Sequence, residues 1–320
     1  MDRLSAGLSG SEASGAEADG PVSDPVDAAA AALQQARLHL AVPEELFALN
    51  ELDVLYSEGE EALWTYMRPA GRPSFTPPML KDFDSWQRLI SSHFGGGRLP
   101  LKYLVLGSRA PGVFCFGGDL ELFASLIREG NRDGLAAYGY RCVEILHRNM
   151  QSLDLPILTI GMVQGQALGG GFEALLSFDY IIAERGASFG LPEVMFGLFP
   201  GMGAHAILSR RLGQATADRI IMGNEVYSAE AMFELGIVQQ LAEPGEGEAA
   251  VRDFMARSSR RHAGLVGARR ASRRVNAVSL TELRDIVDHW ADAALQLREQ
   301  DLKLMQRLAG AQSRLPRAAA

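Results

Sequence analysis

Three consecutive glycines, Gly169–Gly171, lie between an apolar run and a helix-like segment, and they constrain the fold more than any other feature of the chain. The run from Pro156 to Val163 is rich in isoleucine, leucine and valine, which is typical of a buried strand. Glycine adopts backbone angles that other residues avoid, so this turn lets the chain reverse sharply or approach a ligand closely. A strand that turns through glycines into a helix predicts an α/β fold with crossover connections.

The same order of strand, glycine turn and helix occurs earlier in the chain. Residues 101–107 form another buried-strand pattern, and the turn Phe114–Asp119 follows it. Asp119 is suited to accept hydrogen bonds at the start of a helix, which is predicted from Leu120 to about Glu129. The other expected elements are two short strands within 54–67, a loop at 69–78, helices at 80–92 and about 133–150, and a strand at 180–183.

The last part of the chain has a helical pattern. Apolar residues keep a helical period, with one gap, from Leu283 to Leu308, which predicts one long amphipathic helix. Such a helix is expected to fold back over the core or to pack on a neighbouring subunit.

The beginning of the chain has the opposite character. Residues 1–36 hold six acids and one base, and they have too little apolar surface to offset the entropy of ordering. We therefore expect a disordered acidic tail at 1–30, either inert or used for binding, followed by a folded core at 45–245 and a helical C-terminal region at 246–320.

Composition excludes several classes of protein. The 320 residues carry a net charge of −8, which argues against nucleic-acid binding, and no apolar run is long enough for a membrane-spanning helix. Two cysteines, Cys115 and Cys142, are too few for a disulfide scaffold, and no secretory signal is evident, so a cytoplasmic protein is expected. The six histidines do not cluster, and neither a metal site nor a cofactor is predicted.

Two glycine turns and two glutamates are the candidates for chemistry. Backbone N–H groups are free at the start of a helix, and Gly118 and Gly170 each stand at such a place. If both N–H groups point at one position, they form an oxyanion hole, which stabilises a carbonyl oxygen as it gains charge. Glu173 follows on the first turn of the second helix, and Glu193 stands further on beside Pro192. Two carboxyls that face one substrate differ in pKa and can divide the acid and base roles.

Each of these features also has a purely structural explanation. A glycine-rich turn before a helix is common where elements pack tightly, and a glutamate on a first helical turn interacts favourably with the helix dipole. Glu193 taken alone is explained as the cap of a turn. The stretches 114–119, 164–173 and 188–203 in this order are much less expected by chance, and together they favour a catalytic site.

These three stretches resemble the signature of the crotonase (enoyl-CoA hydratase/isomerase) superfamily. The resemblance extends from about Leu52 to the C-terminus and is most specific over 157–241. It implies a spiral of ββα units and a homotrimer or hexamer. It also implies that the oxyanion hole and the acid–base pair belong to Gly118, Gly170, Glu173 and Glu193.

Within the superfamily, the sequence looks most like the bacterial diffusible-signal-factor synthases. Those enzymes dehydrate a 3-hydroxyacyl chain on acyl carrier protein and hydrolyse the thioester to a free cis-2-unsaturated fatty acid, a cell-to-cell signal. Phe116 stands where the family usually has a small residue beside its coenzyme A site, which argues against ordinary coenzyme A binding. The stretch from Arg257 to Arg274 has seven arginines and no acid, and it is either a docking face for the acidic carrier or a solvated helix face. Met202 and Trp290 are candidates for the wall of the acyl tunnel.

Two other functions stay open at this level. One is a conventional enoyl-CoA hydratase or isomerase of fatty-acid metabolism. The other is a regulatory protein that binds a sensor through a crotonase scaffold, because a fold does not determine a function. The intact glutamate pair favours an enzyme, although a synthase can also bind a regulator.

Overall fold

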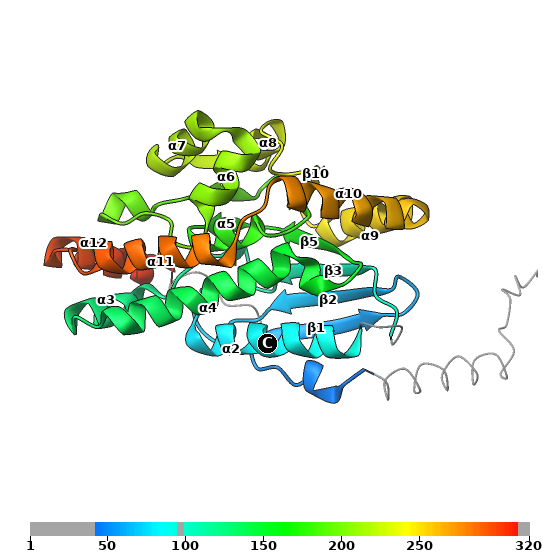
Figure 1. Ribbon diagram of the computed structural model, residues 1–320, viewed down its shortest axis with the longest axis horizontal. Coiled ribbons are helices and arrows are strands. Elements are labelled where there is room, and N and C mark those ends of the chain that lie inside the picture. The colour runs from blue at the N-terminus through cyan, green and yellow to red at the C-terminus, as the bar shows by residue number, and fades with distance from the viewer. Residues whose placement is uncertain (1–41, 95–98, 313–320) are drawn as a thin grey trace, which may run out of the picture. The chain divides into compact units, whose positions relative to one another are not determined.

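The computed structural model describes residues 42–94 and 99–312, and the expected tail at 1–30 lies outside this part of the chain. Strands and helices alternate along the described residues, and the strands form two sheets (Figure 1). The α/β fold with a helical C-terminal region, predicted from the sequence, is confirmed.

The larger sheet has six strands in the order β1-β2-β3-β5-β7-β10. β1 and β2 pair antiparallel, and all other neighbours in this sheet run parallel. The bounds of the strands are β1 (Leu52–Ser57), β2 (Ala62–Met67), β3 (Tyr103–Ser108), β5 (Leu158–Val163), β7 (Tyr180–Glu184) and β10 (Gln240–Ala242). Every residue of β2, β3 and β5 is buried, because helices cover both faces of the sheet.

The smaller sheet has four strands in the order β4-β6-β8-β9. These are β4 (Val113–Cys115), β6 (Gln166–Leu168), β8 (Ser188–Gly190) and β9 (Val226–Ser228). β4, β6 and β8 are parallel, whereas β9 pairs antiparallel with β8. Parallel neighbours end on the same side of a sheet, so the loops that follow β4, β6 and β8 converge there.

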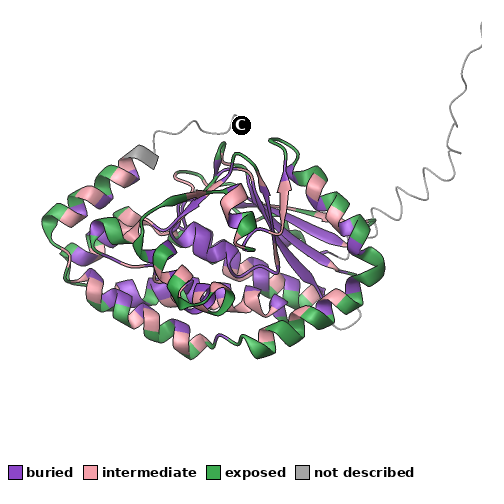
Figure 2. Cartoon of the chain, turned by 90° about the horizontal axis from the view of Figure 1, so that it is seen from above, coloured by how far each residue is buried: buried purple, intermediate pink, exposed green. Residues whose placement is uncertain are grey.

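Helices surround the two sheets, and one short helix lies inside. They are α2 (Pro77–His93), α3 (Leu120–Arg128), α4 (Arg132–Met150), α5 (Gly170–Leu175), α6 (Ala204–Leu212), α7 (Gln214–Met222), α8 (Ala229–Glu234), α9 (Gly247–Ser258), α10 (His262–Val275), α11 (Leu280–Ala294) and α12 (Glu299–Gln312). Single 3-10 turns are η1 (Glu44–Leu46), η2 (Ser152–Asp154), η3 (Glu193–Phe196) and η4 (Ser259–Arg261). All residues of α5 are buried, while the outer helices expose one side (Figure 2).

α2 begins earlier than the sequence pattern predicts. Residues 69–78 are expected to be a loop, but Pro77 and Pro78 are the first two residues of α2. The side chain of Thr76 accepts a hydrogen bond from the N–H of Met79 (3.3 Å) and caps the helix. Proline fits the first turn, because an N–H there has no partner within the helix. The two prolines therefore mark a helix start.

The prediction of one long helix from Leu283 to Leu308 is wrong. The chain forms α11 and α12, with a break at 295–298. The side chain of Asp301 accepts a hydrogen bond from the N–H of Arg298 (3.0 Å), as the third residue of a helix does in a capping box, so a new helix starts at Glu299. α12 packs along α3 and η3 of the same chain (Figure 1). The last helical segment therefore folds back over the core, as one of the two expectations from the sequence has it.

The arginine-rich stretch from 257 to 274 is partly structural. Arg273 donates to the carboxylate of Asp179 (2.6 Å), and the guanidinium of Arg269 lies 4.2 Å from the centre of the Tyr180 ring. These contacts hold α10 against β7 and against Asp179, the residue just before β7. The exposed arginines of the stretch are Arg257, Arg260, Arg261, Arg270 and Arg274.

No helix in residues 42–94 and 99–312 is both long and apolar enough to cross a membrane.

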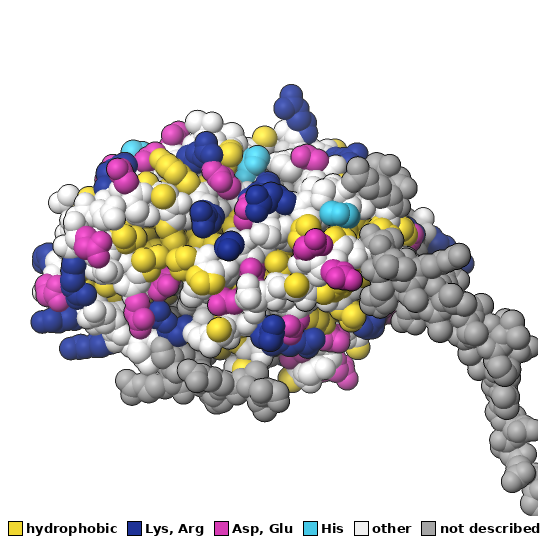
Figure 3. Space-filling model, turned by 90° about the horizontal axis from the view of Figure 1, so that it is seen from below, with side chains coloured by type: hydrophobic (Ala, Val, Ile, Leu, Met, Phe, Trp, Pro, Cys, Tyr) yellow, Lys and Arg dark blue, Asp and Glu magenta, His cyan; other side chains and the backbone are white. Residues whose placement is uncertain are grey.

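On the face shown in Figure 3, acidic and basic side chains are interspersed, with hydrophobic side chains between them. That face therefore has no large area of one charge sign.

Candidate active site

Gly117 and Gly118 form the first turn of the site, directly after β4. Gly117 has a φ of +85°, in the left-handed region that favours glycine. A Cβ atom on Gly117 would lie 2.4 Å from the backbone nitrogen of Gly170, so this turn packs directly against the second one. The side chain of Asp119 accepts a hydrogen bond from the N–H of Leu122 (3.2 Å) and begins α3, as the sequence predicts.

Gly169 and Gly170 form the second turn, where β6 passes into α5. Gly169 has a φ of +54°, and Gly170 is the first residue of the helix, so its N–H has no acceptor within α5. A Cβ atom on Gly170 would lie 3.5 Å from the backbone nitrogen of Gly118. The N–H groups of Gly118 and Gly170 are therefore close together, and neither donates to a protein acceptor within the described ranges 42–94 and 99–312.

Glu173 lies on the first turn of α5 and is only 1% exposed. Its Oε1 atom accepts hydrogen bonds from the N–H groups of Met202 (2.8 Å) and Ala204 (3.0 Å). Burial raises the pKa of Glu173 to about 7, and the backbone hydrogen bonds oppose this rise because they stabilise the ionised form. The backbone thus holds this carboxyl in one orientation and supports its negative charge.

Glu193 is the first residue of η3, directly after Pro192. The residue as a whole is half-buried, but its Oε2 atom is shielded from solvent and has no hydrogen-bond partner in the part of the chain that the structure describes. Burial, and to a smaller degree the nearby charge of Glu173, raises the pKa of Glu193 to about 8. The carboxyl of Glu193 therefore has a higher pKa than the carboxyl of Glu173 and is more readily protonated.

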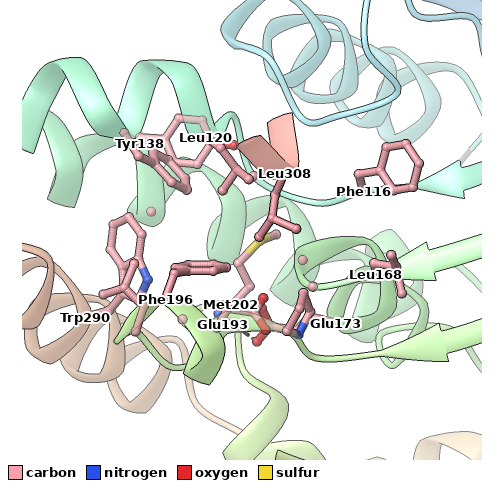
Figure 4. A pocket seen from close by; sticks show the side chains of 18 residues that line it. Phe116, Leu120, Tyr138, Leu168, Glu173, Glu193, Phe196, Met202, Trp290 and Leu308 are labelled. Atoms are coloured by element: carbon pink, nitrogen blue, oxygen red, sulfur yellow. Dashed lines mark hydrogen bonds between the residues drawn. The ribbon is translucent and has the colours of Figure 1, made fainter. Parts of the chain in front are cut away.

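The carboxyls of Glu173 and Glu193 face one pocket, side by side (Figure 4). Two neighbouring buried carboxyls resist being ionised together, so the pair holds one proton near neutral pH. Because the backbone supports the charge of Glu173, the proton belongs on Glu193. One carboxylate, one carboxylic acid and two neighbouring N–H groups can move a proton to and from a carbon next to a carbonyl group.

Apolar side chains form the remaining walls, and the pocket encloses about 820 Å³ including its open mouth. In Figure 4, Tyr138, Phe196 and Trp290 lie on one side of the carboxyls, and Phe116 and Leu168 lie on the other. Leu308 of α12 also lines the pocket, because α12 folds back. One side of the pocket thus suits a hydrocarbon group.

All six residues predicted for the site line this one pocket: Gly118, Gly170, Glu173, Glu193, Met202 and Trp290. Tyr138, Phe196 and Leu308 also line the pocket, and they were not predicted as site residues. The hydroxyl of Tyr138 accepts from the N–H of Asp119 (3.2 Å) and donates to the carbonyl of Phe75 (2.6 Å), so it fastens α4 to the first turn. Nothing in the pattern of α4 distinguishes Tyr138, whereas Leu308 belongs to the helical period already noted.

Metal-binding side chains and thiols are two further features of the described residues. In the described residues, no group of three or more histidine, cysteine, aspartate or glutamate side chains could hold a metal ion. Cys115 and Cys142 are buried free thiols. Burial raises the pKa of Cys115 to about 12, so its thiol is neutral at physiological pH.

Glu193→Gln is expected to stabilise the protein, and the gain should grow with pH. The pKa of Glu193 is higher in the folded protein than its ordinary value of 4.5, so folding takes up a proton and stability falls as pH rises from about 4.5 through about 8. Glutamine removes this dependence, and the gain at pH 9 is on the order of 2 to 4 kcal/mol over that at pH 4.5. Urea unfolding of both proteins across this range measures the difference. Glu58→Gln, the same change at an exposed position, is the control. If the unfolding free energy of both variants depended on pH in the same way, the carboxyl of Glu193 would not be shielded from solvent.

Residues 100–262, just over half of the chain, match the family model described as enoyl-CoA hydratase/isomerase. The chain belongs to this family. The matched residues contain both glycine turns and both glutamates of the site, whereas Trp290 and Leu308 of the pocket lie outside the match.

Similar proteins agree with this assignment. The chain is 34% identical over 200 residues to methylglutaconyl-CoA hydratase 1, mitochondrial, of Pyricularia oryzae, a match that covers 60% of this chain and 55% of that protein. It is 29% identical over 194 residues to the short-chain-enoyl-CoA hydratase of Clostridium acetobutylicum, covering 60% and 69%. The chain therefore spans little more than half the length of the first of these relatives.

The fold is also that of solved members of the family. The enoyl-CoA hydratase from Bacillus halodurans superimposes with a TM-score of 0.66 and 17% identity, over 81% of this chain and all of that one (100%). At this identity the likeness concerns the fold alone.

Proposed function

We propose that this protein catalyses the reversible addition of water to the C2–C3 double bond of a 2-enoyl thioester. The observation that carries the proposal is the pair of carboxyls of Glu173 and Glu193 beside the N–H groups of Gly118 and Gly170 in one pocket. Two similar proteins that are named as hydratases of coenzyme A thioesters support the same reaction class.

The thioester oxygen binds between the N–H groups of Gly118 and Gly170. Negative charge develops on that oxygen when water attacks C3, and the two donors stabilise it. Each donor of this kind is typically worth about 3 to 4 kcal/mol in the transition state. The N–H groups are already in place because glycine alone fits both turns, so no rearrangement is needed during the reaction.

The two carboxyls take complementary roles in hydration. Ionised Glu173 accepts a proton from the water whose oxygen bonds to C3, and neutral Glu193 donates its proton to C2. One water molecule is added, and the two carboxyls exchange their protonation states, which solvent then resets. In the dehydration direction each proton moves the opposite way, so Glu193 is the base and Glu173 is the acid.

The purified protein is expected to hydrate trans-2-enoyl thioesters, measured as loss of the conjugated thioester chromophore. Coenzyme A thioesters of several chain lengths are the first substrates, and the Glu173→Gln variant gives the background rate. Absence of turnover with every chain length, on coenzyme A and on acyl carrier protein, would reject the proposal.

A second candidate is the two-step synthase reaction of the diffusible-signal-factor enzymes. Phe116 favours it, because this bulky residue lines the pocket where the family usually has a small residue, and the exposed arginines of 257–274 suit an acidic carrier protein. After dehydration of a 3-hydroxyacyl thioester, a second water attacks the carbonyl carbon and the C–S bond breaks. The carrier thiol takes the proton and leaves, and the N–H groups of Gly118 and Gly170 stabilise the tetrahedral intermediate.

A matched pair of substrates separates the two candidates. The same 3-hydroxyacyl chain is offered on coenzyme A and on acyl carrier protein, and the products are identified by mass spectrometry. Free cis-2-enoic acid, formed faster from the carrier protein, supports the synthase. Reversible hydration of the coenzyme A thioester without release of free acid supports the hydratase.

A further inference from the structure

A second pocket lies at the other end of α5 from the two glutamates; we call it the arginine pocket. Glu173, on the first turn of α5, lines the glutamate pocket, whereas Leu176 and Phe178, just after the helix, line the arginine pocket. The two pockets share no residue of the described part of the chain. The arginine pocket encloses about 1150 Å³ including its open mouth, so it is a separate place with room for a small ligand.

Positive charge dominates the lining of this pocket. Four arginines line it, two from the last turn of α6 and two from α10: Arg210, Arg211, Arg269 and Arg273. Asp179 is the one acidic residue that the described ranges 42–94 and 99–312 contribute to the lining. A concave surface with such an excess of one charge sign attracts anions.

Two of the four arginines already have carboxylate partners. Arg210 donates to both carboxylate oxygens of Glu282 (2.9 Å each). Arg273 donates to the carboxylate of Asp179 (2.6 Å), and that carboxylate also accepts from the N–H of Thr159 (3.1 Å). Glu282 and Asp179 therefore hold their own partners, and each pairs directly with one arginine of the pocket.

The other two arginines have no carboxylate partner. Arg211 donates from Nη2 to the carbonyl oxygens of Leu176 (2.9 Å) and Phe178 (3.4 Å), while its Nε and Nη1 atoms have no acceptor within 42–94 and 99–312. The guanidinium of Arg269 packs on the ring of Tyr180, and in the same ranges its side chain forms neither a hydrogen bond nor an ion pair. Two guanidinium groups with free N–H donors thus line one pocket.

These two guanidinium groups also repel each other. Arg211 is open to solvent on the pocket side, but the protein behind it buries part of its guanidinium. This burial and, to a smaller degree, the charge of Arg269 lower the pKa of Arg211 to about 10, and the charge of Asp179 opposes the shift. Both arginines stay charged at neutral pH, so an anion bound between them would relieve their repulsion.

The remaining walls of the arginine pocket are largely apolar. Phe178, Ile207 and Val278 are buried side chains of this wall, and Leu212 and Leu235 extend it. Apolar walls with a few well-placed charged groups are typical of sites for small organic ligands. A ligand with an anionic group and an apolar group therefore fits this lining better than a bare ion does.

A phosphate group matches the two unpaired arginines. Its two negative charges equal the charges of Arg211 and Arg269, and its oxygens accept paired hydrogen bonds from planar guanidinium groups. A carboxylate has one charge and two oxygens, so it satisfies one guanidinium and leaves the other unpaired.

We propose that the arginine pocket binds a small phosphate ester, with its phosphate between Arg211 and Arg269 and its apolar part against Phe178 and Ile207. This site goes beyond the proposed hydration reaction and does not depend on it, because none of its residues lines the glutamate pocket.

Calorimetric titration of the full chain with phenyl phosphate, in a buffer without phosphate, tests the site. Phenyl phosphate is expected to bind once per chain, inorganic phosphate to compete with it more weakly, and phenol not to compete. Arg269→Gln should raise the Kd for phenyl phosphate by about tenfold or more, since one charged hydrogen-bonding partner is lost. Arg211→Lys, which keeps the charge but not the planar donors, should also raise it.

Arg261→Gln is the matched control, because Arg261 is exposed and lines no part of the pocket. Its Kd should stay within about twofold of the wild-type value, as an exposed charge away from the ligand contributes little. Phenyl phosphate should raise the Tm of the wild type and of this control more than that of Arg269→Gln, and unfolding without ligand checks that every variant is folded.

Four results would overturn the proposal. One is the absence of phenyl phosphate binding, and another is equal weakening by Arg269→Gln and Arg261→Gln, which would indicate a general attraction to positive charge. Equal affinity for inorganic phosphate and phenyl phosphate would reject an ester site. A change of oligomeric state in Arg269→Gln, measured by light scattering, would mean that this arginine pairs with a second copy of the chain.

Discussion

Glu173→Gln and Glu193→Gln are each expected to lower kcat for hydration of a 2-enoyl thioester by about 10²- to 10⁴-fold. Glutamine has the shape of glutamate, and an amide oxygen at position 173 still accepts the hydrogen bonds from Met202 and Ala204. The fold is therefore retained, whereas an amide neither takes nor gives the proton that each step requires. Initial rates at pH 7 and thermal unfolding of each variant measure both parts of this prediction.

The two carboxyls act on the same transition state, so the double variant should be little slower than either single one. Glu234→Gln, an exposed change on α8, serves as the control and should keep the wild-type rate. If either single variant keeps more than about a tenth of the wild-type rate, that carboxyl is not an essential proton donor or acceptor.

Local chemistry made the order of strands and helices predictable from the sequence, and the six residues predicted for the site line one pocket. Asp119 caps α3 as its short polar side chain suggests, and glycines stand at both turns where β4 and β6 lead into helices. Parallel strands end on one side of a sheet, so the loops that follow β4, β6 and β8 meet there, and the two turns and Glu193 line one pocket.

Features that depend on contacts between distant segments could not be predicted in this way. At the break between α11 and α12, the side chain of Asp301 accepts a hydrogen bond from the N–H of Arg298, which a periodic pattern of apolar residues does not reveal. Tyr138 enters the site only because α4 packs beside the loop that contains Asp119. Met202 was expected to contact substrate, but its backbone bond to Glu173 follows from the tertiary fold.

The third glycine of the second turn shows which of the explanations left open by the sequence applies at one position. From the sequence, the turn that contains Gly171 is explained either by close approach to a ligand or by tight packing of elements. In the structure, a Cβ atom on Gly171 would lie 2.1 Å from the carbonyl oxygen of Cys115 and 2.7 Å from its carbonyl carbon. These are backbone atoms, so no rotation of a side chain relieves the contact, and this glycine is required by the packing of one turn on the other.

Gly171→Ala is accordingly expected to destabilise the protein by about 3 kcal/mol or more, because α5 must move away from β4 to admit one methyl group. Activity should fall as well, since the same movement displaces the N–H of Gly170 and the carboxyl of Glu173. Urea unfolding measures the first effect, and the hydration rate of the remaining folded protein measures the second. Gly186→Ala is the matched control: its Cβ atom would meet nothing within 4 Å, so its stability should stay within about 0.5 kcal/mol of wild type. Equal stability of the two variants would mean that the turns do not pack backbone to backbone, and the convergence of the two N–H groups would lose its structural basis.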